Sequence, residues 1–274
     1  MRGSSAGSLD RLGDALVAAM AAGAQGGAIG DDLFGAAGAL RDSAALRRAA
    51  TDPSAPAQAK SDLMTHLFSG KLGEPATELL ASAASLRWAT GSDLVESIEQ
   101  LGVVAHVVGA DAEGAGDRLE DQLFELAQLV AVNHDVREAL SDPGRNAADK
   151  QALIRRLLEG KANRATIALA ERSVLGAHGT VTAALTAYSE LAAQARKRVV
   201  ARVTVAAPLT EEAHHRLVTV LTRDYGQPVH LNIVLNPAIV GGIRVEIGDQ
   251  VIDGTVSARL DDASRLLSGR RLAG

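Results

Sequence analysis

A repeat at a spacing of 90 residues constrains the fold of this 274-residue chain more than any other feature. When residues 31–71 are placed over residues 121–161 without a gap, 14 of the 41 aligned positions are identical. The identities include residues less common than alanine: Phe34 with Phe124, Asp52-Pro53 with Asp142-Pro143, and Gly70-Lys71 with Gly160-Lys161. Self-similarity at a fixed period indicates one structural unit that occurs twice.

Apolar residues at helical spacing predict the helices of one unit. In the second copy we expect a helix from about Asp117 to Leu140, with one stripe formed by Leu119, Leu123, Leu126 and Val130. The following Ser141-Asp142-Pro143-Gly144 ends it, because proline cannot continue a helix. A short helix at 148–158 is expected to bury Leu153, Leu157 and Leu158 before Gly160 caps it, and helices at 164–175 and 181–196 complete a small bundle.

The region after residue 197 has a different pattern, which predicts strands. Val199, Ala201, Val203 and Val205 alternate with other residues, as do Val229, Leu231, Ile233 and Leu235. Between them, Thr210 is expected to cap a helix whose apolar stripe is Ala213, Leu217, Val220 and Leu221. These elements predict a small α+β domain in the order strand, helix, strand, strand, helix.

The run from Asn236 to Leu260 specifies its own local structure. Ile243, Val245 and Ile247 recur at a period of two after the pair Gly241-Gly242, which is typical of a half-buried strand that follows a turn. The turn dipeptides Gly248-Asp249 and Asp253-Gly254 then flank a short extended piece. A helical period follows from Val256 to Leu267.

Composition excludes several classes of function. Aromatic residues make up only 2% of a chain that is 47% hydrophobic, so its cores must consist of Ala, Leu and Val, which favours closely packed helices. A net charge of -5 argues against a nucleic-acid partner, which needs a cationic surface. The chain has no cysteine and no long run of large apolar residues, so we expect neither thiolate chemistry nor a membrane-spanning helix.

No motif predicts catalysis, a cofactor or a metal. Gly70-Lys71 and Gly160-Lys161 lack the Ser or Thr and the preceding strand of a phosphate-binding loop. His214 and His215 are adjacent on a helix, point in different directions and are expected to face solvent. Trp88 is expected in the core, with a role as an anchor for a partner helix as the alternative.

The run from Asn236 to Leu260 resembles the C-terminal signature of the delta subunit of F-type ATP synthase, whose mitochondrial homologue is the oligomycin-sensitivity-conferring protein. The residues that carry the resemblance occur in the family's order and spacing: Gly241, Gly242, Gly248, Asp253, Gly254, Arg259 and Leu260. For Asp253 and Arg259 we favour an ion pair that fixes the last helix, with exposed charge as the alternative. The resemblance covers residues 101–274 continuously and residues 9–100 through the repeat, as in the longer actinobacterial delta subunits.

The resemblance implies a mainly α fold, with two tandem helical bundles followed by a small α+β domain. We expect a first bundle at 1–100, a second at 101–196 and the α+β domain at 197–274. It implies a non-catalytic stator subunit on the cytoplasmic face of the cell membrane that links the catalytic head to the peripheral stalk and resists torque. The implied partners are alpha subunits of the head, with beta subunits as a further candidate, and the b-type stalk subunit, through which the membrane is reached.

The family's groove for a helix of the alpha subunit implies three candidate contact residues in the second copy: Val104, Val107 and Val174. Their alternative role is in the core of the domain itself. A helical-repeat adaptor unrelated to ATP synthesis remains the rival function, because the duplication alone is also typical of that class.

Overall fold

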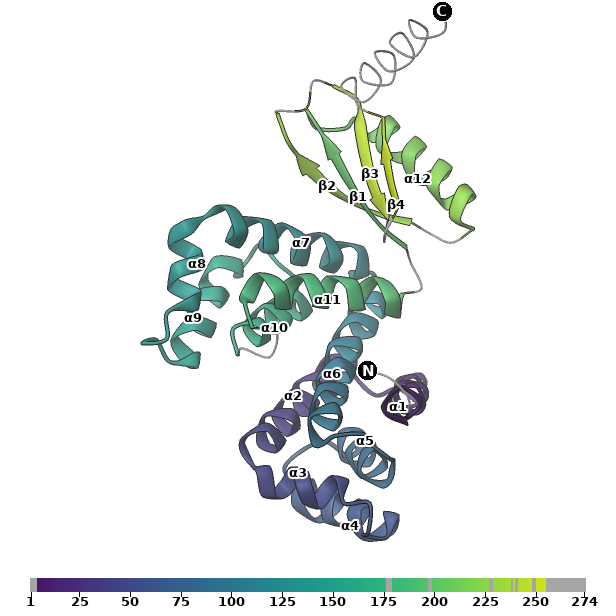
Figure 1. Cartoon of the computed structure of the whole chain (residues 1–274), viewed down its shortest axis with the longest axis vertical. Helices are drawn as coiled ribbons and strands as arrows, with labels where there is room; N and C mark the ends of the chain where they lie inside the picture. The colour runs from purple at the N-terminus through teal and green to yellow at the C-terminus, as the bar shows by residue number, and fades with distance from the viewer. Residues whose placement is uncertain are drawn as a thin grey trace, which may run out of the picture. The chain divides into compact units, whose positions relative to one another are not determined.

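The computed structural model describes residues 4–175, 179–196, 199–226, 229–237, 239, 241–247 and 250–254. The chain divides into two compact units, Met1–Ala192 and Ala193–Gly274. The first unit is helical and the second contains a sheet (Figure 1). The mainly α fold with a small α+β portion near the C-terminus is therefore confirmed.

The first copy of the repeat folds into helices that close around an apolar core. Its elements are α1 (Ser4–Ala21), α2 (Gly26–Asp42), α3 (Ala44–Thr51), α4 (Ala57–Phe68), α5 (Glu74–Ser85) and α6 (Gly91–Ala112). Leu12, Leu33, Met64, Leu80 and Ile98 come from five of these helices, and each is no more than 1% exposed. The core thus joins residues from nearly the whole length of the copy.

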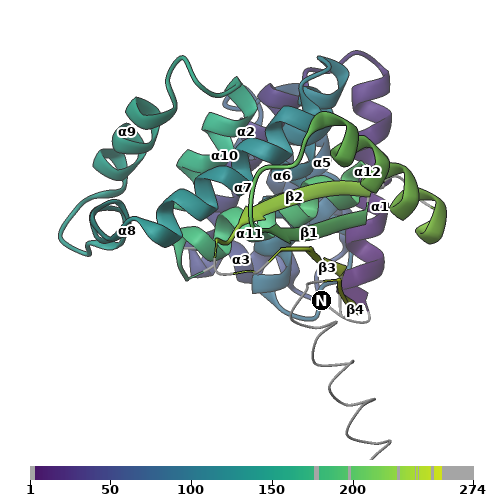
Figure 2. The same cartoon turned by 90° about the horizontal axis from the view of Figure 1, so that it is seen from above.

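The second copy repeats the same order of helices. Its elements are α7 (Gly116–Val132), α8 (His134–Ser141), α9 (Ala147–Leu158), α10 (Arg164–Ser173) and α11 (Val181–Ala195). Each begins 90 residues after its counterpart, from Gly116 of α7 against Gly26 of α2 to Val181 of α11 against Gly91 of α6. Both views place α8 and α9 at the outer edge of this copy (Figure 1 and Figure 2).

Side-chain contacts repeat at the same spacing. The carboxylate of Asp32 accepts a hydrogen bond of 2.8 Å from the backbone N–H of Gly73, and 90 residues later Gln122 Oε1 accepts one of 3.2 Å from Asn163 N–H. Arg47 donates to the carbonyl of Arg41, and its counterpart Arg137 donates to the carbonyl of Ala131. The duplication is therefore visible in the interactions as well as in the helices.

Helix α6 takes part in both copies. It is the last helix of the first copy by register, since Gly91 corresponds to the first residue of α11. It also precedes α7 as α1 precedes α2, and it contacts α2, α7 and α10. The sequence-based boundary at residue 100 lies inside this 22-residue helix.

The expected single helix from Asp117 to Leu140 was wrong. The structure has two helices there, because the side chain of Asn133 accepts a hydrogen bond from Val136 N–H and starts α8. Ser43 does the same for α3 in the first copy. The stripe of the first part is confirmed, since Leu119, Leu123, Leu126 and Val130 are buried. In α9 the buried residue is Ile154, whereas the expected Leu153, Leu157 and Leu158 are not fully buried.

The second unit is a four-stranded sheet covered on one face by a helix. Its elements are β1 (Val199–Val205), α12 (Glu211–Tyr225), β2 (Val229–Leu235), β3 (Ile243–Ile247) and β4 (Gln250–Asp253), with strand order β2-β1-β3-β4. Strands β1 and β2 are parallel because α12 crosses between them, whereas β3 pairs antiparallel with both β1 and β4.

Alternation along the strands builds the core of this unit. Ala201, Val203 and Val205 are at most 2% exposed and pack with Leu217 and Leu221 of α12. Thr210 caps α12 by accepting a hydrogen bond from Ala213 N–H, as expected. Val220 was placed wrongly in the stripe of α12, because it is exposed and Val218 packs on the core instead. The expected helix from Val256 to Leu267 lies outside the described residues.

Candidate functional site

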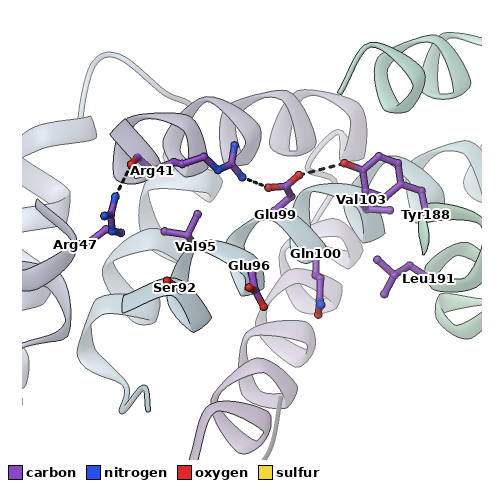
Figure 3. Close-up of a pocket in the computed structure, with 10 residues that line it drawn as sticks. All are labelled: Arg41, Arg47, Ser92, Val95, Glu96, Glu99, Gln100, Val103, Tyr188 and Leu191. Carbon is purple, nitrogen blue, oxygen red and sulfur yellow. Dashed lines mark hydrogen bonds and ion pairs between the residues drawn. The ribbon is translucent and has the colours of Figure 1, made fainter. Parts of the chain in front are cut away.

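A buried carboxylate on α6 is the centre of the candidate site. Glu99 lies on α6 between the buried residues Ile98 and Leu101 and is only 4% exposed. Four donor contacts reach its two oxygens: Arg172 Nε at 3.2 Å, Arg172 Nη2 at 3.0 Å, Tyr188 Oη at 3.1 Å and Arg41 Nη2. Figure 3 shows the contacts with Arg41 and Tyr188.

The donors come from different copies of the repeat. Arg41 is in the last turn of α2 in the first copy, whereas Arg172 is in the last turn of α10 and Tyr188 is on α11 in the second. Because Glu99 is on the helix that both copies share, its carboxylate ties them together. We call Arg41, Glu99, Arg172 and Tyr188 the Glu99 cluster.

An aromatic row extends from the Glu99 cluster along the contact between α2 and α6. The guanidinium of Arg172 lies 5.0 Å from the centre of the Phe34 ring, a cation–π contact. Phe34 stacks in turn on His106, with ring centres 5.4 Å apart. His106 Nε2 then lies 3.2 Å from a carboxylate oxygen of Asp31. The row therefore links Arg172 of α10 to Asp31 of α2 through the rings of Phe34 and His106.

The surroundings of these groups set their charge states. Burial opposes the ionised form of Glu99, but the guanidinium groups of Arg172 and Arg41 outweigh it and lower the pKa of this carboxyl. Burial and the neighbouring Glu99 raise the pKa of the Tyr188 hydroxyl, so it stays protonated and donates. The contact with His106 lowers the pKa of Asp31. The Glu99 cluster thus holds an ionised carboxylate between two guanidinium groups and joins helices of the two copies.

Close helix packing holds the aromatic row in place. A Cβ atom on Gly30 would lie 2.4 Å from the His106 ring, and one on Gly102 would lie 2.6 Å from the Phe34 ring. Both distances are far below van der Waals contact, so only glycine lets α2 and α6 approach this closely.

A cleft of about 410 Å³ lies beside the Glu99 cluster. Ser92, Val95, Glu96 and Gln100 of α6 line it together with Arg41, Arg47, Tyr188 and Leu191 (Figure 3). Its walls come from α2, α3, α6 and α11. Apolar contact is therefore incomplete where α11 approaches the first copy.

The three valines nominated from the sequence differ in exposure. Val107 is fully buried on α6, and Val174, directly after α10, is 8% exposed. Val104 is half-buried and packs against the core of the first copy. Their contact with a partner stays a prediction, and Val104 alone has appreciable surface for it.

The family-signature residues that the structure describes have structural positions. Gly241 and Gly242 have φ values of 87° and 88°, which L-residues with side chains rarely adopt. Gly254 donates a hydrogen bond of 2.9 Å to the carbonyl of Ile243, so it continues the ladder after Asp253 at the end of β4. Gly248 and Arg259 lie outside the described residues. The expected ion pair between Asp253 and Arg259 therefore lies outside them too.

The tryptophan and the histidine pair considered in the sequence are not part of the Glu99 cluster. Trp88 is half-buried against the core of the first copy and donates a hydrogen bond of 2.8 Å to the carbonyl of Ala83. His214 and His215 are exposed on α12. Within the described ranges, no cluster of three or more His, Asp or Glu is arranged to hold a metal ion. Across the same ranges, every helix is too short or too polar to cross a membrane.

Sequence reasoning missed the Glu99 cluster. Glu99 and Arg172 are 73 residues apart, so no local pattern connects them. The repeat carried a usable signal, because Glu99 corresponds to Ser189 and Arg172 to Ser82 in the other copy. Charges that appear in only one of two aligned copies point to a role outside the shared fold.

Comparison with known proteins gives the family. Residues 104–267 match the family described as ATP synthase delta (OSCP) subunit. Three relatives named "ATP synthase subunit delta" are similar over most of their length. The protein from a Nocardioides species is 49% identical with 98% of each chain covered, and that from Kineococcus radiotolerans is 42% identical with 91% of each covered. That from Beutenbergia cavernae is 36% identical, covering 98% of this chain and 100% of the relative.

One solved structure is also similar in part. A chain in the cryo-EM structure of the Toxoplasma gondii mitochondrial ATP synthase hexamer is 17% identical, with a TM-score of 0.35 over 63% of this chain and 96% of that one. The sequence relatives, in contrast, align over both copies of the repeat as well as the α+β unit. The chain belongs to the ATP synthase delta (OSCP) subunit family.

Proposed function

We propose that this chain is a non-catalytic peripheral-stalk subunit of an F-type ATP synthase, which links the catalytic head to the b-type stalk subunit. The observation that carries the proposal is the 49% identity to a protein named ATP synthase subunit delta over 98% of both chains. On this proposal the helical unit holds N-terminal helices of alpha subunits, and the α+β unit holds the C-terminal part of the b-type subunit.

The architecture of the helical unit suits a joint that bears load. Helix α6 is continuous over 22 residues, which is about 33 Å at the usual rise per residue. Because it belongs to both copies, no flexible linker separates them. The Glu99 cluster adds buried, directional contacts across the same joint. Such a body can transmit torque from the head to the stalk while protons drive synthesis.

The partners determine where the chain works. A stalk subunit of this kind sits on the cytoplasmic face of the cell membrane and reaches the membrane only through the b-type subunit. Helix-in-groove binding is the expected mode, in which the partner helix presents apolar residues at positions i, i+3, i+4 and i+7. Val104 is half-buried and offers some surface for such a helix, whereas Val107 and Val174 are buried.

The test is a titration of two fluorescent peptides against the whole chain by fluorescence anisotropy. One peptide is the N-terminal segment of the alpha protein, and the other is the C-terminal segment of the b-type stalk protein. We expect saturable binding of both. Val104→Glu should weaken binding of the alpha peptide, whereas Val132→Glu, at an 81% exposed valine of α7, should not.

Circular dichroism establishes that both variants fold. Failure of the whole chain to bind either peptide contradicts the linking role. An unchanged affinity for the alpha peptide in folded Val104→Glu removes that residue from the interface.

A further inference from the structure

The Glu99 cluster is not needed to close either bundle. At the position of Arg172, the first copy has Ser82, which is exposed on α5, and that bundle is still built around an apolar core. At the position of Glu99, the second copy has Ser189 on α11. Counted from α1, Glu99 corresponds to Leu9, which is also uncharged, and the two charges reach the first copy through Arg41 and Phe34 of α2. They therefore join α10 and α11 to the first copy and are not required by the repeated fold.

Apolar contacts alone leave the angle between the copies weakly specified. Burial of apolar surface is non-directional, so helices that touch only through it can slide or rotate at small cost. The cleft of about 410 Å³ between α11 and the first copy shows that packing does not fill this joint. Some other contact must fix the orientation.

The geometry at Glu99 supplies that direction. Two nitrogens of Arg172 reach the carboxylate at 3.2 Å and 3.0 Å, and the same guanidinium also lies over Phe34 of α2. A planar guanidinium held in this way has one acceptable orientation. Buried ion pairs add little net stability, because desolvation offsets their attraction, but in some proteins they select one arrangement over others.

We propose that the Glu99 cluster is a lock that fixes the angle between helices α7–α11 and the first bundle, α1–α6, and that without it α7–α11 swing as a body against α6 while the helices within each group keep their packing. Arg41 and Tyr188 complete the lock from the first and the second copy, respectively. This property does not depend on the stalk function, since it concerns the isolated chain.

Distance measurements between spin labels on the whole chain test the lock. The chain has no cysteine, so a pair of introduced cysteines is labelled without background. His66→Cys on α4 and Arg156→Cys on α9 lie at aligned, exposed positions of the two copies and span the joint. A second pair, Arg118→Cys on α7 with Arg156→Cys, lies within the second copy and reports movement inside it.

Two changes open the lock in different ways. Arg172→Ser introduces the residue of the first copy, and Glu99→Leu combined with Arg172→Leu replaces the buried pair by apolar side chains, which preserves stability in other proteins. Glu171→Gln is the matched control, because it removes the partly exposed ion pair with Arg155 inside the second copy. Circular dichroism and the unfolding midpoint show which variants keep their fold.

We expect the spanning pair to give a distance distribution about twofold broader, or shifted, in both opened variants, with no change in Glu171→Gln. The pair within the second copy should keep its width throughout. A spanning distribution unchanged in a folded opened variant overturns the proposal. Equal broadening of both pairs also overturns it, since the second bundle would then have loosened rather than swung. If Arg172→Ser does not fold, the double leucine variant decides.

Discussion

Ser82 and Arg172 occupy the same position in the two copies of the repeat, yet the serine is exposed and the arginine is 6% exposed. Their helices, α5 and α10, begin at matching residues. Arg172 faces α6 and α2 of the first copy, where Glu99 and Phe34 receive it. The same local fold therefore acquires a new contact when a neighbouring copy is present.

The two copies also differ in how completely they are packed. Phe68 at the end of α4 is 8% exposed within the apolar core of the first copy. Its counterpart Leu158 at the end of α9 is only half-buried. The first copy is thus closed by apolar contacts, and the second combines a looser outer edge with buried charges at the joint. Four sets of variants test this contrast.

The largest effect is expected for truncation at the end of the fourth helix of the repeat. Phe68→Ala should lower the free energy of unfolding by about 3–5 kcal/mol, because a buried aromatic ring leaves a cavity. Leu158→Ala should cost about 1–2 kcal/mol, since that side chain is already partly hydrated. Chemical denaturation of the whole chain measures both. Equal losses would show that the copies are packed equally well.

A smaller effect is expected where α2 crosses α6. Gly26→Ala should destabilise the chain by about 1–3 kcal/mol, because overpacked sites must shift their backbone. The new Cβ would lie 2.4 Å from the carbonyl oxygen of Ala105 and 2.9 Å from Gly109 Cα. Gly38→Ala on the same helix meets no atom within 4 Å and should stabilise by about 0.5–1 kcal/mol. Thermal unfolding distinguishes the signs, and a stabilising Gly26→Ala would refute the close approach.

The helix caps should behave alike in both copies. Ser43 and Asn133 each accept a hydrogen bond of 3.2 Å from a backbone N–H of the first turn of α3 and α8. Replacing either by alanine should cost about 1 kcal/mol. Denaturation of the two variants side by side is the measurement. A clear inequality would mean that the copies differ in local structure as well as in packing.

The smallest effect is expected from Asp31, whose pKa is held below 3.8 mainly by its contact with His106. Because the pKa is lower in the folded state, its contribution to stability is complete above about pH 4 and disappears as the pH falls through the folded value. Asp31→Asn should therefore flatten the acid limb of the stability profile by less than about 1 kcal/mol, since the side chain is half exposed. Urea denaturation between about pH 7 and pH 3 measures it, and an identical acid limb would contradict the assignment.

Local patterns predicted the elements of this fold well. The starts of α9, α10, α11 and α12 follow from caps and helical periods, and β1, β2 and β3 follow from alternation. The break at Asn133 was missed because the apolar period continues across it into Leu140. Alignment with the first copy offers the correction, since Ser43 and Asn133 are both capping residues.

The candidate site could not be predicted in the same way. Glu99 is one of several polar residues of its helix, beside Glu96 and Gln100, and its partners are 58, 73 and 89 residues away. Contacts at such separations depend on how the bundles meet, which no helical period encodes. The role of the glycines of α2 and α6 could not be predicted either, because it depends on how closely the facing helix approaches.

The shared helix also determines how this chain can be taken apart. Two copies with six helices each are built from eleven helices, α1 to α11, because α6 serves twice. A cut at residue 100 splits Gly91–Ala112 and gives neither fragment a complete bundle. Fragments designed to behave as independent bundles must therefore overlap, with residues 91–112 present in both. A deletion that removes one copy must likewise keep residues 91–112, because the remaining copy needs this helix to be complete.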